Sequence, residues 1–226
     1  NISGGPKLFQ LYIHKDKGLT DNLIDRCKRS GFSAMCLTVD TVVAGNRERD
    51  HKWGFTTPPK LTLKSLISFA THPSWSINYL THEKFQLANV SHFTKKGSSI
   101  AKGVMEYINE QYDPAMGWKD AEYCIKRWGG PFAIKGVMSV EDAKRAAQIG
   151  ASAIMLSNHG GRQLDGSRSP FDQLPAIVDA VGGKLEIIVD GGIRRGTHVL
   201  KALSLGATAC SFGKGYLFGL GAGGQK

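Results

Sequence analysis

A histidine and an arginine three residues apart, with two glycines between them, are the residues of this sequence best suited to chemistry. They lie in SNHGGRQLDG, residues 157–166, directly after the apolar run Ala153 to Leu156. Histidine transfers protons near neutral pH, and the planar arginine fork binds a carboxylate through two parallel hydrogen bonds. The pair His159 and Arg162 therefore indicates proton removal from a substrate that carries a carboxylate. The alternative is a polar strand-to-helix loop without activity.

Short apolar runs alternate with amphipathic segments, and these elements must position the pair. The runs that predict strands are residues 7–13, 34–39, 132–137, 153–156, 185–189 and 209–212. The segments that predict helices are residues 19–30, 61–71, 74–85, 118–128, 139–149, 170–181 and 197–205. Strands that alternate with helices predict a parallel sheet with right-handed crossovers.

Polar or glycine-rich residues follow nearly every predicted strand. In a (β/α)8 TIM barrel the carboxyl ends of all strands share one face, where active sites lie. The sequence therefore predicts an α/β fold of this class. A doubly wound open sheet is the alternative, but that fold concentrates its chemistry at one crevice, whereas five strand ends here carry candidate residues.

Composition restricts the partners and the compartment. The 226 residues carry a net charge of +10, but the basic residues form no long run and no nucleic-acid module is visible, so nucleic acid is not expected as a partner. The four cysteines show no metal-ligand spacing, so we expect no metal site, buried thiols and a reducing, cytoplasmic compartment. No signal peptide or membrane span is visible. The chain begins at Asn1 without Met, which is typical of a fragment.

Residues 51–104 interrupt the alternation of strands and helices. This segment contains seven lysines and one glutamate, a net charge of +6, and aromatic residues such as Trp75 and Tyr79 lie between the charges. Lysines with interleaved aromatics suit an anionic membrane surface, which would place the protein on the inner face of a membrane. The alternative is a solvated insertion packed on the outside of the domain.

Three further features indicate chemistry. The turns DGGIR and FGKG follow the last two strands, and their backbone N–H groups, with Arg194 and Lys214, could bind an anion. Lys135 lies within an apolar strand, so it either reaches inward to a cofactor anion or points outward as an edge lysine. Asp40 ends a strand and could orient the imidazole of His159, or simply cap a turn.

The motifs FQLY, LTVDT followed by NRERD, IKGV, SNHGGRQLDG and DGGIRRG together resemble the FMN-dependent 2-hydroxy acid dehydrogenase family. That family includes glycolate oxidase, L-lactate dehydrogenase, mandelate dehydrogenase and flavocytochrome b2. The resemblance covers nearly the whole chain in the same motif order. The segment FTTPPKLTLKSL most resembles the membrane-associated L-lactate dehydrogenase branch.

The resemblance implies a (β/α)8 barrel with FMN at its C-terminal face, of which this chain would be a fragment covering strands three to eight. Residues 1–226 would form one partial FMN-binding domain with an insertion at about 51–116. It implies oxidation of a lactate-like L-2-hydroxy acid to the 2-oxo acid. The catalytic residues would be His159 as base, Asp40 as its partner, Lys135 beside the flavin and Tyr12. Arg162, Arg47 and Tyr12 would bind the substrate, and Gln10, Thr38, Lys135, Ser157, Asp190, Gly192, Arg194, Gly213 and Lys214 would bind FMN.

The resemblance also implies an electron acceptor, which would be a quinone, a cytochrome or O2, and a homo-oligomer, a tetramer in the family. The lactate-dehydrogenase-like insertion favours a dehydrogenase over an oxidase that uses O2. The sequence departs from the family where Lys214 replaces an arginine, where Val42 replaces a proline, and in lacking the first two strands and the C-terminal helices. Two other functions stay open: a different FMN barrel, such as a type 2 isopentenyl diphosphate isomerase, and a non-catalytic protein that binds anions or a membrane.

Overall fold

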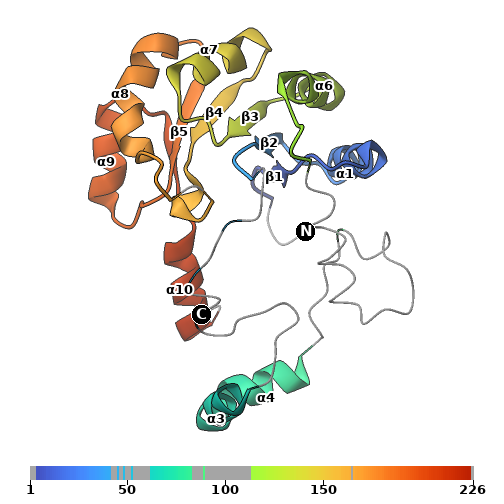
Figure 1. Ribbon diagram of the computed structural model, residues 1–226, viewed down its shortest axis with the longest axis vertical. Coiled ribbons are helices and arrows are strands. Elements are labelled where there is room, and N and C mark those ends of the chain that lie inside the picture. The colour runs from blue at the N-terminus through green and yellow to red at the C-terminus, as the bar shows by residue number, and fades with distance from the viewer. Residues whose placement is uncertain are drawn as a thin grey trace. The chain divides into compact units, whose positions relative to one another are not determined.

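The computed structural model describes residues 4–41, 45, 48, 52, 62–82, 89, 113–163 and 165–224. The chain divides into two compact units, residues 1–46 with 112–226, and residues 47–111. The first unit contains a parallel sheet with its helices (Figure 1). In the second unit the structure describes the helices α3 (Leu63–Thr71) and α4 (Pro73–Thr81).

The sheet of the first unit has six strands, and each strand pairs in parallel with the next strand along the chain. A doubly wound sheet would need a reversal of strand order, so that alternative is wrong. The order is that of a partial (β/α)8 barrel and confirms the predicted fold class. The strands are β1 (Leu8–Leu11), β2 (Ala34–Thr38), β3 (Phe132–Lys135), β4 (Ala153–Leu156), β5 (Glu186–Asp190) and β6 (Ala209–Ser211).

Helices connect the strands, and their apolar sides pack against the sheet. Figure 1 shows α7, α8 and α9 beside β4 and β5, and α1 and α6 beside β1 to β3. Ile24 of α1 and Leu174 and Ile177 of α8 are completely buried. The bounds are α1 (Lys17–Arg29), α6 (Trp118–Trp128), α7 (Val140–Gln148), α8 (Pro170–Val181), α9 (Gly196–Ser204) and α10 (Lys214–Gly223).

Local chemistry explains where several elements begin and end. Helix α1 begins two residues before the predicted start because the Asp16 carboxylate accepts hydrogen bonds from the backbone N–H groups of Gly18 and Leu19. Strand β3 ends at Lys135, earlier than predicted, because Gly136 has a φ of +104°. Ser139 accepts a hydrogen bond from the Asp142 N–H and caps α7, which begins one residue after the predicted start.

Strand β4 and helices α6 and α8 have the predicted bounds, and most other boundaries differ from the prediction by one or two residues. Helix α4 begins at Pro73 and ends at Thr81, and the predicted extension beyond His82 lies outside the described residues. Helix α10 was not predicted at all. Its sequence, KGYLFGLGAG, contains four glycines, which favour a loop over a helix when only local propensity is considered.

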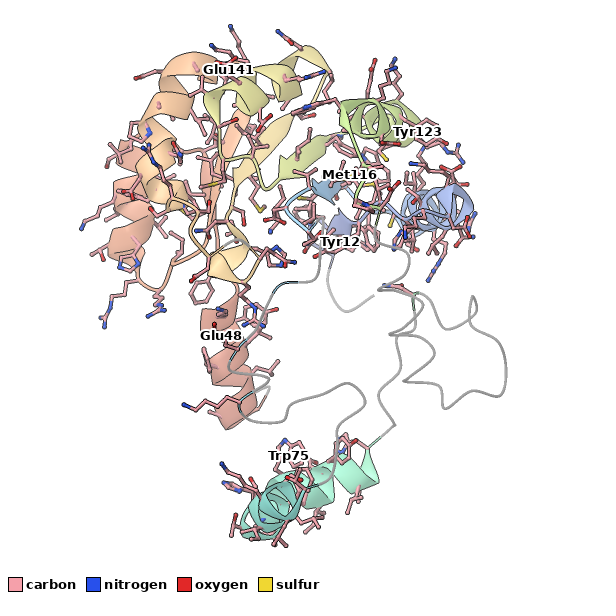
Figure 2. The ribbon with its side chains drawn as sticks, viewed as in Figure 1. Tyr12, Glu48, Trp75, Met116, Tyr123 and Glu141 are labelled. Carbon is pink, nitrogen blue, oxygen red and sulfur yellow. The ribbon has the colours of Figure 1, made fainter. Side chains whose placement is uncertain are left out.

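The carboxyl ends of the parallel strands meet at one edge of the sheet. Thr38 on β2 is in register with Lys135 on β3, and Asp190 on β5 is in register with Ser211 on β6. Tyr12 follows the end of β1 (Figure 2), and His159 lies three residues after the end of β4. The residues predicted to carry chemistry therefore lie at the same edge, as expected for the C-terminal face of a barrel.

Candidate active site

A cavity of about 930 Å³ opens at this edge of the sheet. Its lining comes from the residues that follow β1, β4, β5 and β6, together with Lys135 at the end of β3. Ligand sites of small molecules typically have volumes of about 300 to 1,000 Å³. The predicted site residues that line the cavity are Gln10, Tyr12, Lys135, His159, Arg162, Asp190, Gly192, Arg194, Gly213 and Lys214.

Three side chains form an ionic cluster at the base of this site. The Nδ1 atom of His159 lies 3.0 Å from Asp40 Oδ1, and Lys135 Nζ lies 3.4 Å from the same Nδ1. Lys135 Nζ is also 3.6 Å from Asp40 Oδ2. The carboxylate is only 13% exposed, so solvent screens these charges less than it would on the surface. The alternative that Asp40 only caps a turn does not account for its contact with the imidazole.

The geometry assigns the protons of the imidazole. An ionised carboxylate can only accept hydrogen bonds, and a lysine ammonium can only donate them. Nδ1 therefore cannot donate to Asp40 and accept from Lys135 at once, and the shorter contact favours the carboxylate. With the proton on Nδ1, the other ring nitrogen, Nε2, is a proton acceptor. This is the tautomer that a general base needs.

Lys135 points inward, and its alternative placement as an outward edge lysine is wrong. Its residue is 8% exposed, and its Nζ lies 3.8 Å from Asp190 Oδ2 in addition to its contact with Asp40. A buried ammonium needs negative partners, and here two carboxylates supply them. The thiol of Cys36 is buried in the sheet with Ala133 and Met155, and burial raises its pKa to about 12. Cys36 is therefore a neutral neighbour of this cluster.

Gln10 connects two strand ends. Its Nε2 donates to Thr38 Oγ1 at 2.7 Å and to Tyr12 Oη at 2.9 Å. Gln10 and Tyr12 are two residues apart and therefore point to the same face of β1, as their spacing predicts. Thr38 is buried, so it contributes by orienting the Gln10 amide at the cavity wall.

The cationic side chains of the site lie along the cavity. Arg162, Arg194 and Lys214 line it with Lys135, whereas Asp190 is the only acidic residue among the described residues of the lining. A Cβ atom on Gly160 would lie 3.8 Å from Lys214 Nζ, so this lysine reaches the glycines of the HGGR loop. The cavity therefore favours an anion. Arg47, which the resemblance pairs with Arg162, and Val42 lie outside the described residues.

Two features of the cavity were not predicted from the sequence. Asn158 Oδ1 accepts hydrogen bonds from the N–H groups of Gly160 and Gly161, at 3.0 and 3.3 Å, and shapes the loop that carries His159. Asparagine before two glycines is a signal for such a side-chain-stabilised turn. The second feature is the apolar pair Leu217 and Phe218 of α10, which lines one part of the cavity; it was missed together with its helix.

The residues present fit a flavin mononucleotide. An added Cβ atom on Gly192 or Gly213 would meet nothing within 4 Å, so these two glycines leave backbone open at the cavity, beside the cationic Arg194 and Lys214. Such a combination of exposed backbone and positive charge suits a phosphate. Within the described ranges, no three His, Cys, Asp or Glu side chains gather in a way that could hold a metal ion. None of the helices described is long and apolar enough to cross a membrane.

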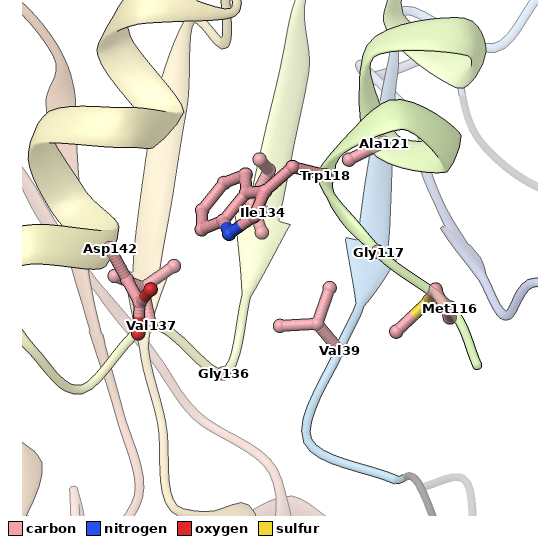
Figure 3. A pocket seen from close by; sticks show the side chains of 9 residues that line it. All are labelled: Val39, Met116, Gly117, Trp118, Ala121, Ile134, Gly136, Val137 and Asp142. Atoms are coloured by element: carbon pink, nitrogen blue, oxygen red, sulfur yellow. The ribbon is translucent and has the colours of Figure 1, made fainter. Parts of the chain in front are cut away.

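A second cavity, of about 240 Å³, has Val39 and Gly136 in its wall, and these two residues are the chain neighbours of Asp40 and Lys135 (Figure 3). Side chains near the start of α6, including Met116 and Trp118, face Val39, Ile134 and Val137 across it, and Asp142 of α7 is the one charged residue among the described residues of its wall. None of the predicted site residues is among the described residues that line this cavity.

Comparisons with known proteins show the family of the chain. The family model of the FMN-dependent dehydrogenases matches residues 1–226. An L-lactate oxidase of Nostoc sp. is 44% identical over 217 residues, covering 96% of this chain and 54% of that protein. An L-lactate dehydrogenase of Xanthomonas campestris pv. campestris is 42% identical over 224 residues, covering 97% of this chain and 57% of that protein.

Solved structures show the same likeness. The monotopic membrane protein (S)-mandelate dehydrogenase superposes with a TM-score of 0.91 at 34% identity, covering 99% of this chain and 58% of that one. A lactate oxidase of Pediococcus acidilactici gives a TM-score of 0.77 at 33% identity, covering 98% of this chain and 52% of that one. The chain thus spans somewhat more than half the length of the relatives it matches. With its motifs, its strand order and these matches, the chain belongs to the family of FMN-dependent dehydrogenases.

Proposed function

We propose that the protein oxidises a lactate-like L-2-hydroxy acid to the corresponding 2-oxo acid with FMN as its cofactor. The observation that supports this most directly is the His159–Asp40 pair, with its Nδ1 to Oδ1 distance of 3.0 Å, beside the buried Lys135 at a cationic cavity. A proton acceptor, an anion site and a ligand-sized cavity are the three things that such a reaction requires. The relatives named L-lactate oxidase and L-lactate dehydrogenase favour this substrate class.

The FMN-binding residues would divide by chemistry. Lys135, Gln10 and Thr38 offer a positive charge and an oriented amide to the flavin ring. Asp190 lies beside Lys135 and accepts a hydrogen bond from Ser157. The remaining residues form the phosphate end, where Lys214 supplies a point charge without the two-pronged hydrogen bonding of an arginine. When bound, FMN supplies an acceptor for the two electrons that leave the substrate. The phosphate-end residues are Gly192, Arg194, Gly213 and Lys214.

His159 would act as the base. Its Nε2 takes one proton from the hydroxy acid, and the imidazolium that results is stabilised by the Asp40 carboxylate at Nδ1. Lys135 lies at 3.4 Å from Nδ1 and opposes that positive charge. Asp40 therefore stabilises two cations in turn: the lysine at all times, and the imidazolium when it forms.

Arg162 and Arg47 would hold the substrate carboxylate, and Tyr12 would hydrogen-bond the substrate. Arg162 lines the cavity three residues beyond His159. A Cβ atom on Gly45 would collide with the backbone carbonyl of Arg162, so Gly45 packs directly against this arginine. A carboxylate bound by the guanidinium would place the adjacent hydroxyl-bearing carbon near the imidazole.

The electron acceptor is the part on which the relatives differ. Oxidases and dehydrogenases are both among the similar proteins, and flavocytochrome b2 is a structural neighbour with a TM-score of 0.72 at 33% identity. We favour a dehydrogenase that passes electrons to a quinone or a cytochrome, because the insertion resembles that of the lactate dehydrogenase branch. A homo-oligomer stays a prediction.

The test is a flavin spectrum of the purified native protein. Under anaerobic conditions, addition of L-lactate, glycolate or mandelate is expected to bleach the flavin absorbance. Admission of O2 or addition of a quinone would then show which of them restores the absorbance and hence which is the acceptor. A flavin that no 2-hydroxy acid reduces, or a protein without flavin, would refute the proposal and favour the non-catalytic alternative.

We also propose that the second unit contacts an anionic membrane surface. Helices α3 and α4 bury no residue, and large apolar side chains such as Leu63, Leu80 and Ile77 are 75, 80 and 61% exposed. Phe69, Trp75 and Tyr79 form a stacked column with centroid distances of 5.4 and 5.2 Å. Exposed aromatics next to an excess of lysines suit the interface of an anionic membrane. The monotopic (S)-mandelate dehydrogenase is a structural neighbour.

Sedimentation with vesicles tests this second proposal. The native protein should sediment with vesicles that contain anionic lipid, and less so as the salt concentration rises. Replacement of Trp75 and Leu80 by serine should weaken the binding, whereas replacement of Leu200 on α9, which is 65% exposed, should not. Failure to sediment at low salt would favour the solvated insertion.

A further inference from the structure

The backbone of His159 is held in an unfavourable conformation. Its φ is +57°, and it is the only non-glycine residue with a positive φ in the described part of the chain. The left-handed conformation is unfavourable in a residue with a side chain, so other contacts must stabilise it. One of these is direct, since the His159 N–H donates to Ser157 Oγ at 3.1 Å.

The Ser157 hydroxyl is itself fixed in direction. Ser157 is completely buried, and its Oγ donates to Asp190 Oδ2 at 2.7 Å, a length typical of a hydroxyl bound to an ionised carboxylate. A hydroxyl has a single proton. Because that proton is used in the hydrogen bond to Asp190, the Ser157 oxygen can only accept a hydrogen bond from the His159 N–H.

The same carboxylate oxygen faces Lys135. Asp190 Oδ2 lies 3.8 Å from Lys135 Nζ, and Asp40 Oδ2 lies 3.6 Å from the same Nζ. The ammonium is therefore shared between two carboxylates. Asp190 Oδ2 is thus linked to the His159 backbone by hydrogen bonds through Ser157, and it attracts the Lys135 ammonium electrostatically.

We propose that Asp190 and Ser157 form a positioning pair: Asp190 orients the Ser157 hydroxyl, which holds the His159 backbone, and also balances Asp40 in setting the position of Lys135. This proposal rests on the proposed function, in which His159 is the base and Lys135 faces the flavin. It gives Asp190 and Ser157 a role that contact with the cofactor alone does not include. The two roles of Asp190 are separable, because only one of them passes through Ser157.

Two variants of the native protein separate the roles. Ser157→Ala removes the acceptor for the His159 N–H but leaves both carboxylates beside Lys135. Asp190→Asn leaves an amide oxygen that can accept from Ser157 but removes one of the two charges that share the ammonium. Ser152→Ala is the matched control, because Ser152 Oγ also accepts a backbone hydrogen bond, from Phe132 N at 3.2 Å, at the opposite end of β4.

Three measurements give the expected result. In Ser157→Ala, amide hydrogen exchange in the peptide around His159 should accelerate. Anaerobic flavin reduction should slow about 10- to 100-fold, which is the cost of a misplaced catalytic group. The midpoint potential of the flavin should stay unchanged in this variant. In Asp190→Asn the midpoint potential should rise, because Lys135 has one carboxylate fewer to neutralise it. Ser157→Thr, which keeps the hydroxyl, should restore slow exchange, and Ser152→Ala should change none of these values.

The outcomes distinguish this proposal from the proposed function. Amide exchange needs neither substrate nor turnover, so faster exchange in Ser157→Ala supports the pair even if no hydroxy acid reduces the flavin. Unchanged exchange in Ser157→Ala overturns the pair even if the protein is an active enzyme. A midpoint potential that falls or stays constant in Asp190→Asn overturns its role toward Lys135.

Discussion

Replacement of Asp40 by asparagine should slow flavin reduction severely while leaving the fold intact. His159 Nδ1 lies 3.0 Å from Asp40 Oδ1 and 3.4 Å from Lys135 Nζ. At an effective dielectric constant of about 20, the carboxylate attracts an imidazolium by roughly 5 to 6 kcal/mol and the lysine repels it by about 5 kcal/mol. The two nearly cancel, so loss of the carboxylate charge leaves the repulsion without compensation.

Solvent reduces the size of this effect. The side chains of His159 and Asp40 are 20 and 13% exposed, so we take about half of the attraction, about 3 kcal/mol, which corresponds to a rate about 10²-fold lower. Anaerobic stopped-flow reduction of the flavin by L-lactate measures this rate in the wild type and in Asp40→Asn, with flavin content as a check on folding. Asp165→Asn, which removes a carboxylate from the loop after Arg162, is the control. A rate in Asp40→Asn within about threefold of the wild type, less than about 1 kcal/mol, would refute the electrostatic reasoning.

Four further outcomes are expected. His159→Gln should retain FMN but lose at least about 10²-fold in turnover, the low end for general-base catalysis; near-normal kcat would remove His159 from the mechanism. Arg162→Lys keeps the charge but not the fork, so kcat/KM should fall for every 2-hydroxy acid, and an unchanged value would exclude carboxylate binding. Gly136→Ala should slow turnover by displacing Asp40, because the added Cβ would lie 2.8 Å from Asp40 Cβ at a φ of +104°; wild-type turnover would contradict this. Burial raises the pKa of the Cys36 and Cys124 thiols to about 12. Between pH of about 9 and 12 these thiols lose their protons in the unfolded chain but keep them in the folded chain. For each of the two thiols, the free energy of unfolding should therefore fall by about 1.4 kcal/mol for every unit of pH in that range. Serine at both positions should flatten the profile measured by urea denaturation, and an equally steep profile would rule out the thiols as its cause.

The sheet and most of its helices could be predicted because their signals are local. Runs such as Ala34 to Thr38 are apolar and buried on both faces, which is typical of parallel strands. The contact between Asp40 and His159 could be anticipated without coordinates, since both follow parallel strands and their carboxyl ends share an edge. The roles of these residues in catalysis stay predictions.

The parts that could not be predicted depend on contacts between distant residues. The direction of Lys135 depends on two carboxylates, from strand ends on either side of β3. Helix α10 forms although it contains four glycines, whose low helix propensity favours a loop. The positive φ of His159 has no signal in the residue itself, because left-handed histidines are uncommon. The hydrogen bond from Ser157 to Asp190 joins residues 33 positions apart.

The strand order has a consequence for how the site is assembled on the ribosome. Each described strand after β1 pairs with the described strand made before it, whereas Asp40 and His159 are 119 residues apart. At about 5 to 20 residues per second, the carboxylate is synthesised on the order of 10 s before its imidazole. Lys135 lies between them in the chain, so it is the first residue of the cluster that can neutralise Asp40. Vectorial synthesis would therefore form the lysine–carboxylate pair first, and His159 would join a charge pair that already exists.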